Sequence, residues 1–138
     1  MLLRFNRPEP RVAEALTLRG LATAAIDVSD GLAADLSHLL HASKVGATIK
    51  TEKLPLAKTL RSEWLTREQA WRYALTGGED YELCFTIPRA RQGEFELRFG
   101  AYDCGYICVG VIEEQAGLRV TTPDGKPFAL ATKGYEHF

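Results

Sequence analysis

The sequence predicts an α+β domain, a two-layer sandwich in which a mixed sheet carries helices packed on one face. Helical and strand patterns are intermingled along the chain without strict alternation, which favours this class. The length of 138 residues fits one domain, and no linker or internal repeat divides it. With 46% apolar and 25% charged residues, the composition is that of a soluble globular domain and excludes a disordered tail or a disulfide miniprotein.

The first part of the chain predicts helix, strand and helix. Pro8 and Pro10 are typical of a helix start, and Gly20 of its end. Residues 22–28 form a short, almost wholly apolar run that suits a strand covered on both faces. A second helix follows over residues 32–44. Its apolar stripe consists of Leu32, Leu36, Leu39 and Leu40.

The rest of the chain supplies most of the strands. Residues 46–50 read as a strand, and 67–75 as the clearest part of a looser helical region. Residues 81–87 alternate in polarity, as a half-buried strand does. After a short helix near 91–99, residues 106–112 predict a strand that is apolar on both faces. A hairpin around Pro123-Asp124-Gly125 completes the domain.

Charge and hydropathy exclude some classes of partner. The chain has 17 Lys and Arg against 18 Asp and Glu, a formal net charge of −1, so we expect no nucleic-acid partner. No apolar run approaches the ~20 residues of a membrane-spanning helix, and the N-terminus lacks a signal-peptide pattern. We therefore expect no membrane partner and a cytoplasmic location.

The three cysteines, Cys84, Cys104 and Cys108, predict neither a disulfide framework nor a zinc site. Their number is odd, and the predicted strand would hold Cys104 and Cys108 too far apart to share one zinc ion. We expect buried structural thiols.

Residues 27–31, Asp-Val-Ser-Asp-Gly, lie where an apolar strand ends and a helix begins. At such a junction Asp27 and Asp30 can direct two carboxylates at one point, and Mg²⁺ is usually held by one or two carboxylates together with phosphate oxygens. Ser29 and free helix N–H groups offer contacts to a phosphate. The alternative is that Ser29 or Asp30 is simply the N-cap of the helix. That alternative leaves Asp27, an acid closing an apolar strand, unexplained.

A second motif begins with Gly77 and Gly78 and continues with Glu79, Asp80 and, after a tyrosine, Glu82. Two glycines allow the backbone to approach a ligand closely, with acids on either side of the gap. The alternative is a glycine helix end followed by a polar turn. The evidence for a ligand site at this motif becomes stronger only if the fold places it beside residues 27–31.

The C-terminal residues 134–138 combine two aromatic rings and a histidine, which is unusual for a frayed end. They belong either to a ligand site or to the edge of the core.

Four stretches together resemble the C-terminal domain of the thiamine-monophosphate kinase family. They are RPEPRV (7–12), IDVSDGLAADLSHL (26–39), LTGGEDYELCFTIP (75–88) and KGYEHF (133–138). The similarity covers essentially the whole chain in the family's order and spacing. DVSDGL also occurs in the wider superfamily of aminoimidazole ribonucleotide synthetase and selenophosphate synthetase. The combination of GGEDYEL with the terminal GYEHF points to the thiamine branch.

The resemblance implies a synthetase-type C-terminal domain and a kinase that uses ATP and Mg²⁺ to convert thiamine monophosphate into thiamine diphosphate. It implies that Asp27 and Asp30 are Mg²⁺ ligands and that Ser29 contacts the nucleotide. It also implies that Glu79 and Tyr135 contact the thiamine substrate. This agrees with the chemistry, because phosphoryl transfer needs charge neutralisation and alignment more than a protein nucleophile. An aromatic ring such as Tyr135 suits the cationic thiazolium.

Residues 1–138 are expected to be a single domain. In the resembling family, a preceding N-terminal domain carries further metal-binding acids and much of the nucleotide site, and it forms a homodimer contact. Nothing in this sequence corresponds to that domain, so we expect the isolated chain to be inactive. Two alternatives stay open here: a domain of another ATP-using synthetase, and a non-catalytic binding module with the same fold.

Overall fold

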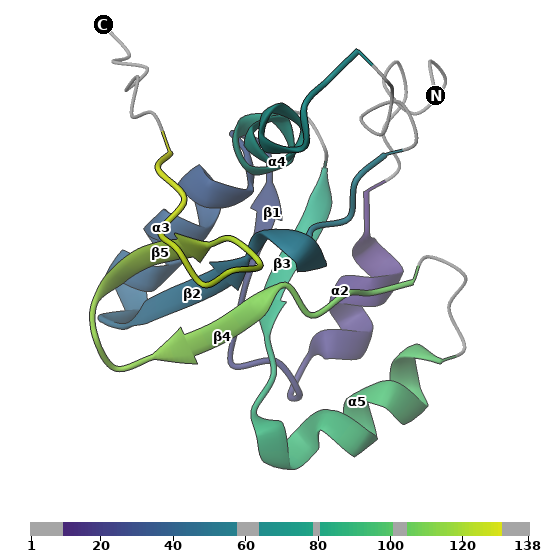
Figure 1. Cartoon of the computed structure of the whole chain (residues 1–138). Helices are drawn as coiled ribbons and strands as arrows, with labels where there is room; N and C mark the ends of the chain where they lie inside the picture. Colours follow the sequence, from purple (N-terminus) through teal and green to yellow (C-terminus); the bar gives the residue numbers. More distant parts are fainter. Residues whose placement is uncertain (1–9, 58–63, 79–80, 101–104, 131–138) are drawn as a thin grey trace, which may run out of the picture.

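The computed structural model describes residues 10–57, 64–78, 81–100 and 105–130 (Figure 1). Its helices and strands, in chain order, are α2 (Val12–Leu18), β1 (Ala24–Val28), α3 (Leu32–Ser43), β2 (Gly46–Lys50), the 3₁₀ turn η1 (Thr51–Lys53), α4 (Arg67–Thr76), β3 (Glu82–Thr86), the 3₁₀ turn η3 (Arg89–Arg91), α5 (Gln92–Phe99), β4 (Gly110–Glu113) and β5 (Gly117–Thr121). Within these ranges, none of the helices could span a lipid bilayer.

The strands form two sheets, one of them mixed. β1 and β3 pair antiparallel as a two-stranded ribbon, with Ala24 opposite Thr86 and Val28 opposite Glu82. The other sheet has the order β4-β2-β5, in which β2 runs antiparallel to β4 and parallel to β5. The predicted α+β class with mixed pairing is confirmed.

Helix α3 is central to the larger core. It packs against β1, β2, β5 and α4, because its leucine stripe faces inward as predicted. Figure 1 shows α3 beside β2 and β5 and α4 above β1. The buried members of this core are Ala33, Leu36, Leu39, Leu40, Ala47, Ile49, Leu54, Trp71, Leu75 and Val120. This packing fixes the start of α3 relative to the end of β1.

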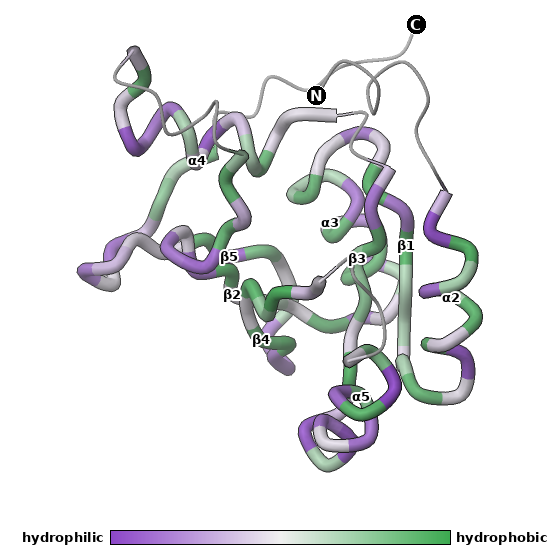
Figure 2. The backbone as a smooth tube through the Cα atoms, turned by 90° about the vertical axis from the view of Figure 1, so that its right-hand side faces the viewer, coloured by the Kyte–Doolittle hydropathy of each residue, from purple (hydrophilic) through white to green (hydrophobic). Residues whose placement is uncertain are grey.

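A second core lies on the other side of the β1–β3 ribbon. Leu18 and Leu21 pack there with Phe95 and Phe99 of α5, and the half-buried Leu83, Phe85 and Ile87 join them. In Figure 2, α3 lies on one side of β1 and α2 on the other. Residues that face each other across the ribbon share a face, so Asp27, opposite Leu83, is on the side of α2 and α5.

Two expectations for the strands are wrong. β1 is not covered on both faces, since Ala25 and Asp27 are exposed. The predicted strand 106–112 is reduced to Gly110–Glu113. Tyr106 instead packs its ring against Phe95, with the ring centroids 4.6 Å apart, and this contact draws the segment toward α5.

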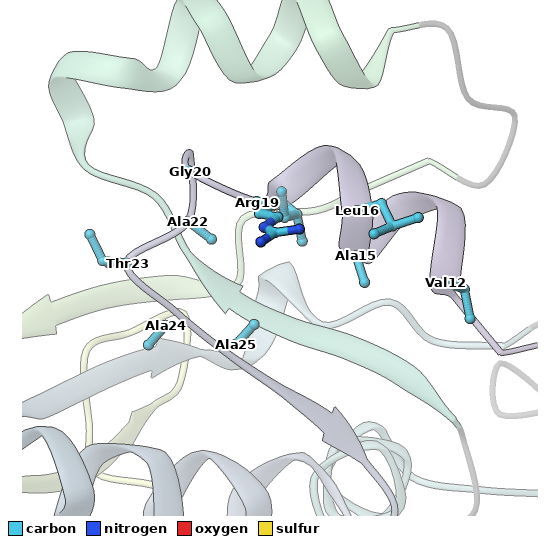
Figure 3. Close-up of a pocket in the computed structure, with 10 residues that line it drawn as sticks. Val12, Ala15, Leu16, Arg19, Gly20, Ala22, Thr23, Ala24 and Ala25 are labelled. Carbon is cyan, nitrogen blue, oxygen red and sulfur yellow. The ribbon is translucent and has the colours of Figure 1, made fainter.

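A shallow groove of about 410 Å³ lies between α2 and the start of β1 (Figure 3). Its lining is apolar apart from Arg19 and Thr23, and it combines Val12 and Leu16 of α2 with Ala25 of β1. None of its lining residues comes from the turn that follows β1. The groove therefore lies apart from the motifs described next.

Candidate functional site

The turn between β1 and α3 presents the two acids of the first motif to solvent. Val28 is buried and anchors the end of the strand, whereas Asp27 before it and Asp30 after it are exposed. Within the described part of the chain, neither of these carboxylates has a hydrogen-bond or ion-pair partner. Both are thus available to a cation from outside this part of the molecule.

Asp35 holds this turn in place through hydrogen bonds. The sequence analysis did not predict a role for this residue. Its Oδ2 atom accepts hydrogen bonds from the backbone N–H groups of Ser29, at 2.9 Å, and of Asp30, at 3.0 Å. The side chain is only 4% exposed. The signal was present in the sequence, because Asp35 lies between Leu32 and Leu39 on the buried stripe of α3, where an acid needs hydrogen-bond partners.

The N-cap alternative for the first motif is wrong. The N-cap of α3 is Gly31, and no side chain caps the helix there. Gly31 has a φ of 110° and a ψ of 147°, a conformation that is essentially confined to glycine. Because the chain turns into the helix through Gly31, the side chains of Ser29 and Asp30 are not needed as caps.

The structure brings the second motif against the first. The backbone N–H of Tyr81 donates to the carbonyl oxygen of Val28 at 2.9 Å. A Cβ atom on Gly78 would lie 2.6 Å from the carbonyl oxygen of Ser29, so only glycine permits this approach. A Cβ atom on Gly31 would lie 3.0 Å from the backbone carbon of Thr76. The described residues of the second motif, which begins with Gly77 and Gly78, therefore lie against the first motif.

An ion pair that the sequence analysis did not predict joins Arg11 to Glu82. Nε of Arg11 donates to Oε2 of Glu82 at 3.0 Å, and Nη2 donates to Oε1 at 2.9 Å. Such a bidentate ion pair fixes both the distance and the relative orientation of the two side chains. The segment before α2 is thus tied to Glu82, the last residue of the second motif and the first of β3.

The fit of the acids to a metal ion follows from their chemistry. Carboxylate oxygens are the hard ligands that Mg²⁺ prefers, and they normally act together with phosphate oxygens. No group of three or more His, Cys, Asp and Glu side chains in the described ranges is arranged to hold a metal. Asp27 and Asp30 fit a site completed by a phosphorylated ligand, rather than a closed structural metal site. Glu79, Asp80 and Tyr135 lie outside the described residues.

Cys84 and Cys108 differ in their solvent exposure. Cys108 is exposed, so the expectation of a buried thiol is wrong for it, because the predicted strand does not form around it. Cys84 is half-buried in β3. Burial, and next the negative charge of Asp35, raise the pKa of the Cys84 thiol from 9.0 to about 11. Cys104 lies outside the described residues.

We expect iodoacetamide at pH 8 to modify Cys84 at least about tenfold more slowly than Cys108, because the thiolate is the reactive form and Cys84 is shielded. Site-resolved mass spectrometry of the folded chain measures both rates. The same chain in concentrated urea is the control, where the two rates should converge. Equal rates in the folded chain would contradict the burial of Cys84.

Comparison with known proteins agrees with this geometry. The family described as "AIR synthase related protein, C-terminal domain" matches residues 5–122. The thiamine-monophosphate kinase of Escherichia coli (strain K12) is 42% identical over 138 residues, which are 100% of this chain and 42% of that protein. The chain thus spans less than half the length of the relatives it matches.

Solved structures show the same relationship. The crystal structure of thiamine-monophosphate kinase from Stenotrophomonas maltophilia K279a is similar with a TM-score of 0.79 and 42% identity, over 92% of this chain and 39% of that one. A structure described as "AaThiL complexed with AMPPCP and TMP" has a TM-score of 0.71 and 34% identity, over 92% of this chain and 40% of that one. The resemblance inferred from the sequence motifs is confirmed.

Proposed function

The chain belongs to the AIR synthase related protein family, as a C-terminal domain, and on that premise we propose that it is part of a thiamine-phosphate kinase. The complete enzyme transfers the γ-phosphoryl group of ATP to thiamine monophosphate. A bond forms between a phosphate oxygen of thiamine monophosphate and the γ-phosphorus, while the bond to ADP breaks. The products are thiamine diphosphate and ADP.

One observation carries the proposal: the close approach of Gly78 to Ser29, which joins the two motifs into one surface. Relatives named thiamine-monophosphate kinase, and a solved relative described with AMPPCP and TMP, support the choice of substrates. AMPPCP is an ATP analogue, which fits a nucleotide as phosphoryl donor.

In this proposal Asp27 and Asp30 hold Mg²⁺, and the hydroxyl of Ser29 contacts the nucleotide. The ion would neutralise phosphate charge, which is the main requirement of phosphoryl transfer. The task of the chain is to keep the two carboxylates at the end of β1 with their backbone fixed. Glu79 and Tyr135 are proposed to contact the thiamine moiety.

The remaining parts of the proposal concern the whole enzyme. We propose that residues 1–138 form one domain, which acts together with an N-terminal domain, and that the complete enzyme is a homodimer in the cytoplasm. The pair of exposed carboxylates at the end of β1 is too small to organise the reaction alone, and no described group of three or more acids, His or Cys could hold a metal, which favours ligands from that other domain.

The test compares the chain alone with a reconstituted enzyme, in which this chain is joined to the part of the E. coli relative that it does not cover. We expect Mg²⁺-dependent formation of thiamine diphosphate by the reconstituted enzyme and none by the chain alone. A folded reconstituted enzyme without turnover would refute the proposed function. Turnover by the chain alone would refute the need for a second domain.

A separate prediction concerns Tyr135. Its replacement, Tyr135→Ala, should weaken binding of thiamine monophosphate by about 0.5–2 kcal/mol, the range of a cation–π contact. This corresponds to a roughly two- to thirty-fold rise in Kd, with ATP affinity little changed. Calorimetric titration of the reconstituted enzyme measures both affinities, and Tyr135→Phe is the milder control. A variant with a lowered Tm and unchanged substrate affinity would place Tyr135 in the core instead.

A further inference from the structure

Asp35 is the one charged side chain that is buried among the residues the structure describes. A buried charge is costly unless hydrogen bonds satisfy it. Here a single oxygen, Oδ2, accepts from two successive backbone amides, those of Ser29 and Asp30. Both amides belong to the turn that runs from Asp27 to Gly31, the first motif.

The direction of these hydrogen bonds is unusual for an acid in the first turns of a helix. In the capping box, such an acid reaches back only as far as the N–H of the N-cap residue. Asp35 instead reaches backward past Gly31, whose own backbone carbonyl oxygen accepts from the N–H of Asp35 at 3.0 Å. The carboxylate therefore stabilises the turn rather than the helix.

Backbone N–H groups that already donate to a carboxylate are not free to bind a phosphate. Successive backbone N–H groups before a helix commonly form a cradle for anions. In this chain the N–H groups of Ser29 and Asp30 are already taken by Asp35. What the turn exposes is the pair of carboxylates of Asp27 and Asp30, which suits a cation.

We propose that Asp35 is a positioning residue that fixes this turn so that carboxylates, and not backbone amides, meet the nucleotide and its metal ion. The proposal rests on the proposed function, because it assigns Asp35 a role in metal use by that site. It makes Asp35 a determinant of the Mg²⁺ requirement without direct contact to the ion.

The first test is the Mg²⁺ concentration for half-maximal activity of the reconstituted enzyme. Asp35→Ala should raise it at least about tenfold, the lower end of the effect of removing a residue that supports a metal ligand. Asp35→Asn keeps an oxygen acceptor and should remain closer to the parent. Leu39→Ala is the matched control, a truncation in the same helix that weakens the core without touching the turn. A folded Asp35→Ala enzyme with the parental Mg²⁺ requirement, or an equal rise in Leu39→Ala, would overturn the proposal.

The second test needs no kinase activity. Hydrogen exchange of the Ser29 and Asp30 amides, measured by NMR on this chain, should be at least about threefold faster in Asp35→Asn, because a charged acceptor forms the stronger bond. Amides of Leu39 and Leu40 should be unchanged. Unchanged exchange at Ser29 and Asp30 would overturn the proposal, also where Asp35→Ala does not fold. An inactive reconstituted enzyme with faster exchange would refute the kinase assignment alone.

Discussion

Asparagine at position 27 or 30 is expected to lower kcat of the reconstituted enzyme at least about a hundredfold, because stabilisation of phosphate charge by a held metal is worth several kcal/mol. Asn keeps the size of Asp but lacks the charge that binds Mg²⁺. Both side chains are exposed, so the free energy of unfolding should change by less than about 0.5 kcal/mol. Steady-state kinetics beside a thermal melt measure the two effects.

The control for these substitutions is Asp124→Asn, in the turn after β5. Its carboxylate contacts Nζ of Lys126 at 2.8 Å, an exposed ion pair whose loss costs little. Activity should therefore stay near that of the parent. If Asp27→Asn and Asp30→Asn were also near the parent, the metal assignment would be wrong.

Alanine at position 31 is expected to destabilise the fold strongly, by about 2–5 kcal/mol, as the sum of a strained backbone and a forced contact. The positive φ of 110° is unfavourable for any side chain. A Cβ atom there would also lie 3.0 Å from the backbone carbon of Thr76 and 3.2 Å from the carbonyl oxygen of Gly77, the first residue of the second motif. Chemical denaturation of the 138-residue chain measures the loss.

Gly125→Ala separates these two causes. Gly125 also has a positive φ, 79°, but its Cβ atom would meet nothing within 4 Å. It should lose only the conformational part, about 1–2 kcal/mol. Equal losses at positions 31 and 125 would show that the contact between the two motifs contributes nothing to stability.

Much of the fold could be predicted because its signals are local. The leucine stripe of α3 and the alternating pattern of β3 depend only on residue spacing, and both elements form where expected. The strand at 106–112 could not be placed, because its start is decided by a contact between Tyr106 and Phe95 from another element. A long-range ring contact of this kind leaves no periodic trace in the sequence.

Only some features of the candidate site could be predicted from the sequence. The acids at positions 27 and 30 stood out because they interrupt an apolar strand and precede a helix. That Gly78 of the second motif lies against Ser29 required the paired strands β1 and β3, which no spacing specifies. Asp35 was overlooked because its partners are backbone amides, which every residue has, and only its place on a buried stripe marked it.

Whether this chain takes part in phosphoryl transfer to thiamine monophosphate is decided by the fate of the γ-phosphate of ATP. The reconstituted enzyme is incubated with Mg²⁺, thiamine monophosphate and ATP labelled in the γ-phosphate, and the products are separated. We expect the label to appear in thiamine diphosphate, and Asp27→Asn and Asp30→Asn to reduce the amount of labelled product at least about a hundredfold. If a folded enzyme released the label only as inorganic phosphate, or left it in ATP, the chain would have no role in phosphoryl transfer to thiamine monophosphate.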